Sequence, residues 1–204
     1  MKAAGRYIII ILSLICICTL TEAAQFGRRF RFGAEWGIHY NPISLEQSNF
    51  IASEGYLVES NELVSGFHIN GMINGFVGYD FSSCVNVAVH SGYLGLQKGE
   101  RVIPISVRGT YCLSEKQTLT GSNIFIEGGV GFRKEHPLSW ISKIGYSYRV
   151  NLGPISVDVN AAALFSYSHP EVYDKYGGHI VARKNLGYSR AYNLGILLTT
   201  AIVF

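Results

Sequence analysis

The sequence predicts an all-β fold, an eight-stranded antiparallel up-and-down transmembrane β-barrel. Three observations predict this fold class. Apolar residues make up 48% of the 204 residues and charged residues only 15%, and the apolar residues alternate with polar ones, as in strands that face lipid on one side. The charged residues gather on the other face of that alternation. The connections on one side of the predicted barrel also include the longest ones.

The N-terminal segment has the pattern of a secretory signal peptide. Lys2 and Arg6 precede an uncharged apolar run over 7–20, and small residues follow that run. An anchoring helix is the alternative, but a helix that spans a membrane needs ~20 apolar residues and this run is shorter. We therefore expect an exported protein with a signal peptide over 1–24 and a single barrel domain over 25–204.

Alternation with a period of two residues predicts the eight strands. They cover 29–41, 65–80, 84–97, 101–113, 122–134, 139–151, 154–166 and 188–204. In the first strand, the outward residues are predicted to be Phe30, Phe32, Ala34, Trp36, Ile38 and Tyr40. A strand of a soluble β-sandwich would alternate in the same way, with its apolar face turned toward a core. The later strands are needed to separate the two folds.

The later strands repeat the pattern in chain order. Their predicted outer face is aliphatic: Ile69, Ile73 and Val77, then Val85, Val87 and Val89, then Ile103, Ile105 and Val107, then Ile124, Ile126 and Val130, then Ile144, then Val157 and Val159. Their predicted inner face is polar: Asn70 and Asn74, then Arg108, Glu127, Lys143 and Arg149, then Asp158, Asn160 and Asn193. Charges of both signs on the inner face favour a polar lumen behind a lipid-facing wall.

The last predicted strand alternates as far as the final residue. One of its faces carries Tyr192, Leu194, Ile196, Leu198, Thr200, Ile202 and Phe204. A terminal aromatic residue on an amphipathic last strand resembles the C-terminal signature that the outer-membrane assembly machinery of Gram-negative bacteria reads. This resemblance implies a location in the bacterial outer membrane and implies that machinery as a partner during biogenesis.

The predicted connections differ in length by parity. Two odd-numbered connections are long, over 41–63 and 168–187, whereas the even-numbered ones around 81–83, 115–117 and 152–154 are short or modest. Outer-membrane barrels have short turns at the end that holds both termini and longer loops at the other end. A soluble fold has no reason to sort its loops in this way.

Cysteine usage leaves one pairing open. The sequence has four cysteines, of which Cys16 and Cys18 leave with the predicted signal peptide. Cys84 and Cys112 then lie nearly opposite one another on adjacent predicted strands, in an oxidising compartment. A disulfide is geometrically possible there, and two free thiols packed at the rim are the alternative, because a register change of one residue moves a side chain across the wall.

Several stretches have the strand, turn and glycine patterns of known barrels. They are 32–41 (FGAEWGIHYN), 92–99 (GYLGLQKG), 101–111 (RVIPISVRGTY), 127–132 (EGGVGF) and the terminal Phe204. Together with the eight strands, they make the chain resemble small outer-membrane barrels of the OmpA/OmpX type and, more narrowly, the PorT-like barrel proteins of Bacteroidetes. The resemblance implies a fold and a membrane, and implies an activity only weakly.

Charged residues are predicted to form a polar network in the lumen. The network consists of Arg31, Glu35, Arg108, Glu127, Lys143, Arg149 and Asp158. Eight strands leave an interior just wide enough for side chains to fill it. We therefore expect ion pairs, centred on Arg108, Glu127 and Arg149, to plug the barrel. A narrow pore is the alternative.

Three histidines are predicted to face the lumen from consecutive strands, His39, His68 and His90. Clustered histidines can bind a metal ion, but no CxxC, HxxxH or HExxH spacing accompanies them. We favour a hydrogen-bonded lumen network, and we predict neither a metal nor a cofactor.

Two stretches allow an enzyme hypothesis. Barrel enzymes that edit lipid A, deacylases and acyltransferases, use His with Ser, and this chain has His90-Ser91 and the segment 166–171 (SYSHPE). A nucleophile and its base must meet within ~3 Å, whereas adjacent strand residues point to opposite sides of the wall. Neither stretch matches the motifs of those enzymes, so we predict no catalytic residues.

The last predicted loop holds the candidates for binding, Tyr173, Tyr176, His179, Arg183 and Lys184. Tyrosine among adaptable polar residues is a composition used for protein recognition, and Lys or Arg there can meet the phosphates of lipopolysaccharide. We predict a structural or surface-interaction role, with outer-membrane lipid, lipopolysaccharide and a protein or glycan ligand as partners. The net charge of +3, without a basic stripe, argues against nucleic acid.

Overall fold

A computed structural model describes residues 29–204 apart from 53, 98–99, 114–117, 135 and 175–177, and it describes only the backbone at 66–68 and 97. The predicted signal peptide lies outside the described residues. Among the described residues, no helix combines the length and the apolar character needed to cross a membrane.

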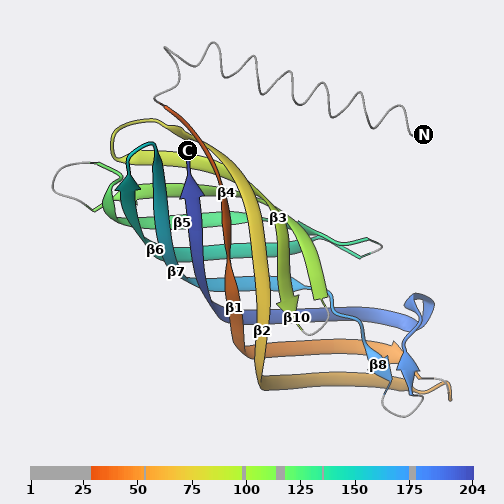
Figure 1. Cartoon of the computed structure of the whole chain (residues 1–204). Coiled ribbons are helices and arrows are strands. Elements are labelled where there is room, and N and C mark those ends of the chain that lie inside the picture. The colour runs from red at the N-terminus through yellow and green to blue at the C-terminus, as the bar shows by residue number, and fades with distance from the viewer. Residues whose placement is uncertain (1–28, 53, 98–99, 114–117, 135, 175–177) are drawn as a thin grey trace, which may run out of the picture.

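The barrel strands, in chain order, are β1 (Phe30–Ile51), β2 (Leu57–Asp80), β3 (Val85–Gln97), β4 (Glu100–Cys112), β5 (Gly121–Phe132), β6 (Ser139–Leu152), β7 (Ile155–Ser168) and β10 (Leu186–Val203). They close in the order β1-β10-β7-β6-β5-β4-β3-β2, with every pair antiparallel (Figure 1). The short strands β8 (Tyr173–Asp174) and β9 (His179–Ile180) form a separate hairpin, followed by the 3-10 turn η1 (Arg183–Asn185). The predicted fold class is confirmed.

The two ends of the barrel are distinct. We name the end that holds Phe30 and Val203 the terminal end, and it also carries the connections 81–84, 113–120 and 153–154. We name the opposite end the loop end, and it carries the β1–β2 turn and the β8–β9 hairpin. Side chains on either face of the wall can therefore be ranked by their height between these two ends.

The wall is apolar outside and mostly polar inside. In β4, the outward Ile103, Ile105 and Val107 are 59%, 47% and 50% exposed, whereas the inward Ser106 and Arg108 are buried. All the aliphatic residues predicted for the outer face are exposed or half-exposed. A soluble sandwich would bury these residues, so the pattern is that of a wall that meets lipid.

The predicted loop over 41–63 is wrong. β1 runs on to Ile51 and β2 begins at Leu57, so only 52–56 form the turn. The register shifts between Asn41 and Ile43, because Pro42 has no N–H to donate to the ladder and occupies a bulge. Beyond the bulge the alternation resumes, but inward side chains now fall on even-numbered instead of odd-numbered positions. A search for one uninterrupted alternation therefore misses this continuation of the strand.

Three strands extend past the rest of the barrel at the loop end (Figure 1). There β1 pairs with β2 on one side and with β10 on the other, as in the register Phe50↔Val58 and Phe50↔Leu186. The inner face of this extension forms a small apolar cluster, in which Phe50, Ala52 and Val181 pack with Val58, Val172 and Leu186. The cluster attaches the β8–β9 hairpin segment to the extended sheet.

The lumen also contains an apolar cluster, which the sequence analysis did not predict because it expected a polar inner face. Its buried members are Met72, Leu94, Leu96, Val102, Phe125, Ile141, Ala162, Leu164 and Leu197. Most of them point inward from the half of the strands nearer the loop end. The interior is therefore layered, with polar and apolar levels, instead of being polar throughout.

Two adjacent glycines of β5 allow a test of the inward packing. A Cβ built on Gly129 would lie 2.3 Å from the carbonyl oxygen of Ile105 and 2.5 Å from Cα of Ser106, whereas one built on Gly128 meets nothing within 4 Å. We expect Gly129→Ala to lower the free energy of unfolding by about 1–3 kcal/mol, because backbone must move to admit the methyl group. Gly128→Ala is the control and should leave stability unchanged or raise it. The temperature of the heat-dependent gel shift in detergent measures both, and equal behaviour of the two variants would contradict the packing described.

Candidate functional site

The outer surface has aromatic residues near both ends of the wall. At the loop end, Tyr192, Tyr167 and Trp140 lie side by side on β10, β7 and β6, and the Tyr167 and Tyr192 rings are 5.0 Å apart. At the terminal end, the rings of Phe32 and Phe204 stack at 5.5 Å. The outward residues of β10 between Tyr192 and Phe204 span about 30 Å along the barrel axis for a strand tilted by ~40°. This height matches the hydrocarbon core of a bilayer.

A central polar layer crosses the lumen and takes one residue from each barrel strand. These residues are Glu35, Asn74, His90, Arg108, Glu127, Lys143, Asn160 and Thr199, and all are buried. Register explains part of the layer, because Arg108 lies opposite Glu127 and Glu127 lies opposite Lys143 on adjacent strands. Other contacts join strands that are not neighbours, as Glu35 on β1 meets Arg108 on β4.

Four charged side chains form a continuous chain through this layer. Glu35 Oε2 lies 2.8 Å from Arg108 Nη2, which lies 2.7 Å from Glu127 Oε2, and Lys143 Nζ lies 2.6 Å from Glu127 Oε1. Because Glu35 is on β1 and Arg108 is on β4, the first of these pairs bridges the lumen. Glu35 is 0% exposed and Lys143 is 1% exposed, so the four charges depend on one another and on nearby hydrogen bonds.

Neutral groups complete the coordination of the two carboxylates. Thr199 Oγ1 and Asn160 Nδ2 donate to Glu35 Oε1 at 2.6 and 3.0 Å. Ser106 Oγ donates to Glu127 Oε1 at 2.7 Å. The guanidinium of Arg108 lies over the Phe125 ring, 4.4 Å from its centroid. The four charged side chains are therefore paired and hydrogen-bonded, as buried charges require.

The prediction that Arg149 belongs to the centre of the network is wrong. Arg149 lies six residues from Lys143 along β6, about 20 Å farther toward the terminal end. There it makes two hydrogen bonds of 2.7 Å to Asp158, its direct partner in the register. Inward direction alone does not give height along the barrel, and height decides which charges meet.

Arg31 is also in the terminal-end part of the lumen. Its Nε lies 2.6 Å from Asp80 Oδ2, and Asn86 Nδ2 donates to Asp80 Oδ1 at 2.8 Å. Sequence reasoning missed Asp80. Its position was a usable signal, because Asp80 is the last residue of β2 and follows the alternation that points inward. The predicted network is thus three separate groups of charges.

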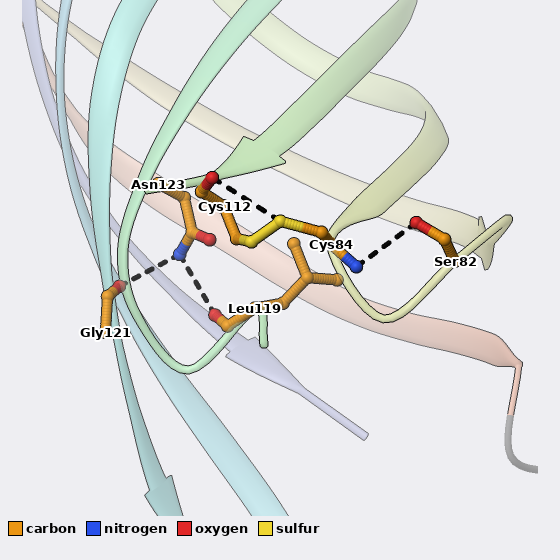
Figure 2. Close-up of a disulfide and its surroundings, with 6 residues drawn as sticks. All are labelled: Ser82, Cys84, Cys112, Leu119, Gly121 and Asn123. Atoms are coloured by element: carbon orange, nitrogen blue, oxygen red, sulfur yellow. Dashed lines mark hydrogen bonds between the residues drawn. A yellow bond between two sulfur atoms is a disulfide. The ribbon is translucent and has the colours of Figure 1, made fainter. Parts of the chain in front are cut away.

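Cys84 and Cys112 form a disulfide at the terminal end, with their Cα atoms 4.9 Å apart (Figure 2). The sequence left this pairing open. The backbone N–H of Cys112 donates to the carbonyl of Cys84 at 2.9 Å, so the bond joins residues that are already opposite in the register. Figure 2 also shows Leu119 beside the disulfide, where Asn123 Nδ2 donates to the Leu119 and Gly121 carbonyls at 3.0 and 2.9 Å.

A further charged group lies at the loop end, where sequence reasoning assigned Glu100 and Glu171 to connections and Arg133 to the end of a strand. Glu100 is buried and accepts a hydrogen bond of 2.9 Å from Ser168 Oγ. Arg133 contacts both Glu100, at 3.5 Å, and Glu171, at 2.5 Å. Partial burial lowers the pKa of the nearby His136, and the Arg133 guanidinium lowers it further. Arg133 is therefore the cation of this group at neutral pH.

The predicted external binding residues lie on and beside the β8–β9 hairpin. Tyr173 is 57% exposed and pairs in the register with Ile180, which is 56% exposed. His179, Arg183 and Lys184 are exposed as well. Tyr176 lies outside the described residues. Of the described candidates, Tyr173 also lines a loop-end cavity of about 390 Å³, together with Phe50 and Val58.

The predicted histidine and serine pairs do not converge. His90 Nδ1 faces Glu35 at 3.4 Å inside the lumen, whereas Ser91 is exposed on the outer face of the wall. In the 166–171 stretch, Ser168 donates to Glu100, and His169 Nδ1 lies 2.7 Å from the backbone carbonyl oxygen of Ser189.

The histidines also lie apart as candidate metal ligands. His39 Nδ1 lies 3.0 Å from the Gly95 carbonyl, and the side chain of His68 lies outside the described residues. Over the part of the chain that is described, no group of three His, Cys, Asp or Glu side chains is placed to hold a metal ion.

Comparison with known proteins finds similar folds only among solved structures. No protein-family description and no curated protein matches the chain. The outer membrane protein OprG from Pseudomonas aeruginosa is similar with a TM-score of 0.45 and 12% identity, over 86% of this chain and 95% of that chain. Neisserial surface protein A has a TM-score of 0.37 and 12% identity, over 83% and 95%. The outer membrane protease OmpT from Escherichia coli has a TM-score of 0.34 and 8% identity, over 86% and 96%.

The central layer predicts a large effect of one substitution. Glu127→Ala leaves Lys143 without its carboxylate and takes one of two carboxylates from Arg108, and we expect it to lower the free energy of unfolding by about 3–5 kcal/mol. Glu54→Ala, at the exposed tip of the β1–β2 hairpin, should change it by less than ~0.5 kcal/mol. Heat-dependent gel migration in detergent compares the two. A melting temperature of Glu127→Ala equal to that of the wild type would show that the four-charge chain does not stabilise the barrel.

Proposed function

We propose that this protein is an integral barrel of the bacterial outer membrane, that its lumen is closed, and that it acts through a recognition surface at the loop end. The observation that supports the membrane part best is the reversal of polarity across the wall. Ionised residues are buried inside, while large aliphatic residues are exposed outside between two aromatic belts. We further propose that the protein is one of the PorT-like barrels of Bacteroidetes, which its strand, turn and glycine patterns resemble.

Two layers of side chains in the lumen support the proposed closure. The four-charge chain and its hydrogen-bond partners occupy the middle of the barrel, and the apolar cluster around Leu94, Leu164 and Leu197 occupies the level nearer the loop end. An ion would have to separate paired charges and then pass an apolar constriction, and both steps are costly. The proposed role is therefore not that of a general porin or of a narrow pore.

The loop end supplies the proposed recognition surface. The extended β1–β2–β10 sheet holds the β8–β9 hairpin through the Phe50 cluster, and the hairpin exposes Tyr173 and Ile180. Exposed tyrosine and basic residues on a supported hairpin are suited to a protein or glycan ligand or to lipopolysaccharide phosphates. The proposed role is non-catalytic, because the histidines and serines that an editing enzyme would need lie apart.

One experiment tests the membrane location and the closed lumen together. The full-length protein should fractionate with outer membranes and should migrate faster on a gel before boiling than after it, because closed barrels resist detergent until heated. Reconstituted in planar bilayers, the same preparation should show no steady conductance. Recovery from the soluble periplasm without a heat shift would overturn the location, and a stable open channel would overturn the closure.

A second prediction concerns the loop end. Arg183→Gln combined with Lys184→Gln should reduce the lipopolysaccharide that copurifies with the protein by roughly threefold, because exposed charge contacts contribute little each. Glu54→Gln, at an exposed position of the same loop end, is the control and should copurify with at least the wild-type amount, because a carboxylate makes no contact with a phosphate. Equal retention by the double variant and the wild type would argue against phosphate contacts by these two residues.

A further inference from the structure

A cavity of about 390 Å³ opens at the terminal end of the lumen, on the opposite side of the central layer from the loop-end surface. Three arginines line it, Arg29, Arg31 and Arg149, together with the hydroxyl-bearing residues Ser82, Thr118 and Thr120. Among the described residues of the lining, Asp80 supplies the one carboxylate. The cavity wall is therefore rich in hydrogen-bond donors and has a positive charge in excess.

Arg149 presents an unused donor at this cavity. Its Nε and Nη2 donate to the two carboxylate oxygens of Asp158 at 2.7 Å each. Arg149 as a whole is only 9% exposed. Its Nη1 is buried and has no hydrogen-bond partner among the described residues. A buried N–H group of a guanidinium without an acceptor is costly, so Arg149 carries one donor more than its described protein partners use.

Arg31 and Arg29 extend the positive wall toward solvent. Arg31 donates its Nε–H to one carboxylate oxygen of Asp80, and Asn86 donates to the other. The Arg31 guanidinium therefore keeps further N–H groups to donate. Arg29 is exposed, and its Nη1 donates to the Tyr79 hydroxyl at 3.5 Å. The three guanidinium groups thus run from the buried part of the cavity to its mouth.

The opposite wall of the cavity is held in place by the disulfide region. Leu119 is buried beside the Cys84–Cys112 bond (Figure 2). On either side of it, the hydroxyls of Thr118 and Thr120 line the cavity. Asn123 fixes this segment through the Leu119 carbonyl, and Asn151 Nδ2 donates to Thr120 Oγ1 at 2.7 Å. The donors are therefore preorganised, which reduces the entropy lost on binding.

We propose that this terminal-end cavity is a binding site for a phosphate group. Guanidinium groups pair with phosphate oxygens through two parallel hydrogen bonds, and hydroxyls supply further donors to a tetrahedral anion. The phosphate is carried either by a small soluble anion that enters from the aqueous side or by a lipid headgroup at the rim. Both sources present the same chemistry to Arg31 and Arg149.

Calorimetric titration of the full-length protein in an uncharged, phosphate-free glucoside detergent tests the proposal. The probes are inorganic phosphate and, in parallel, dioctanoyl phosphatidic acid, with dioctanoylglycerol as the headgroup-free control. Arg31→Gln should weaken phosphate binding about tenfold, the usual size of one charge-assisted hydrogen bond. Arg29→Gln, which removes an exposed side chain, should weaken it by roughly threefold. Arg101→Gln removes an exposed arginine near the loop end and should have no effect.

Each outcome decides the proposal. Binding of inorganic phosphate that falls in Arg31→Gln and Arg29→Gln supports a site for soluble phosphate. Binding of phosphatidic acid alone, with the same losses, supports the site with a lipid headgroup as its ligand. Binding of neither probe, or losses as large in Arg101→Gln, overturns the proposal. The heat-dependent gel shift shows that each variant is folded, and Arg29→Gln carries the test if Arg31→Gln fails to fold.

Discussion

The contact between Glu35 and Arg108 across the lumen is the interaction on which the rest of the barrel depends. It joins β1 to β4 at 2.8 Å, and through Glu127 and Lys143 it draws in β5 and β6. All four charged residues are buried, so each is tolerable only while the others are in place. Buried charges need partners inside the protein, and these four charges find them in one another and in nearby hydrogen-bond donors at mid-height.

The interior above and below that level is built differently. Toward the loop end the lumen is apolar, with Leu94, Leu96 and Leu164 fully buried, and it packs as the core of a soluble domain would. Toward the terminal end it is polar and contains the Arg149–Asp158 and Arg31–Asp80 pairs. The interior is thus packed with apolar side chains toward the loop end and opens into a donor-rich cavity toward the terminal end.

The two ends of the wall are specialised by different means. At the loop end, strand continuation past the Pro42 bulge raises a three-stranded sheet that supports the β8–β9 hairpin. At the terminal end, the Cys84–Cys112 disulfide and Asn123 hold a short connection against the mouth of the lumen. A rigid scaffold that positions connecting segments is the usual way in which barrels acquire binding surfaces.

The sequence by itself determined that there are eight barrel strands, which face of each predicted segment is apolar and outward, and most of the charged residues inside, because alternation is a local property that every strand repeats. Only the tertiary structure decided which charges pair. Glu35 meets Arg108 across the lumen, and Arg149 pairs with Asp158 nearer the terminal end instead of with Glu127. The tertiary structure also decided the strand continuation beyond Pro42, because a bulge reverses parity and breaks the local signal. The Cys84–Cys112 bond likewise depended on the exact register of β3 and β4, which the pattern on either strand alone does not contain.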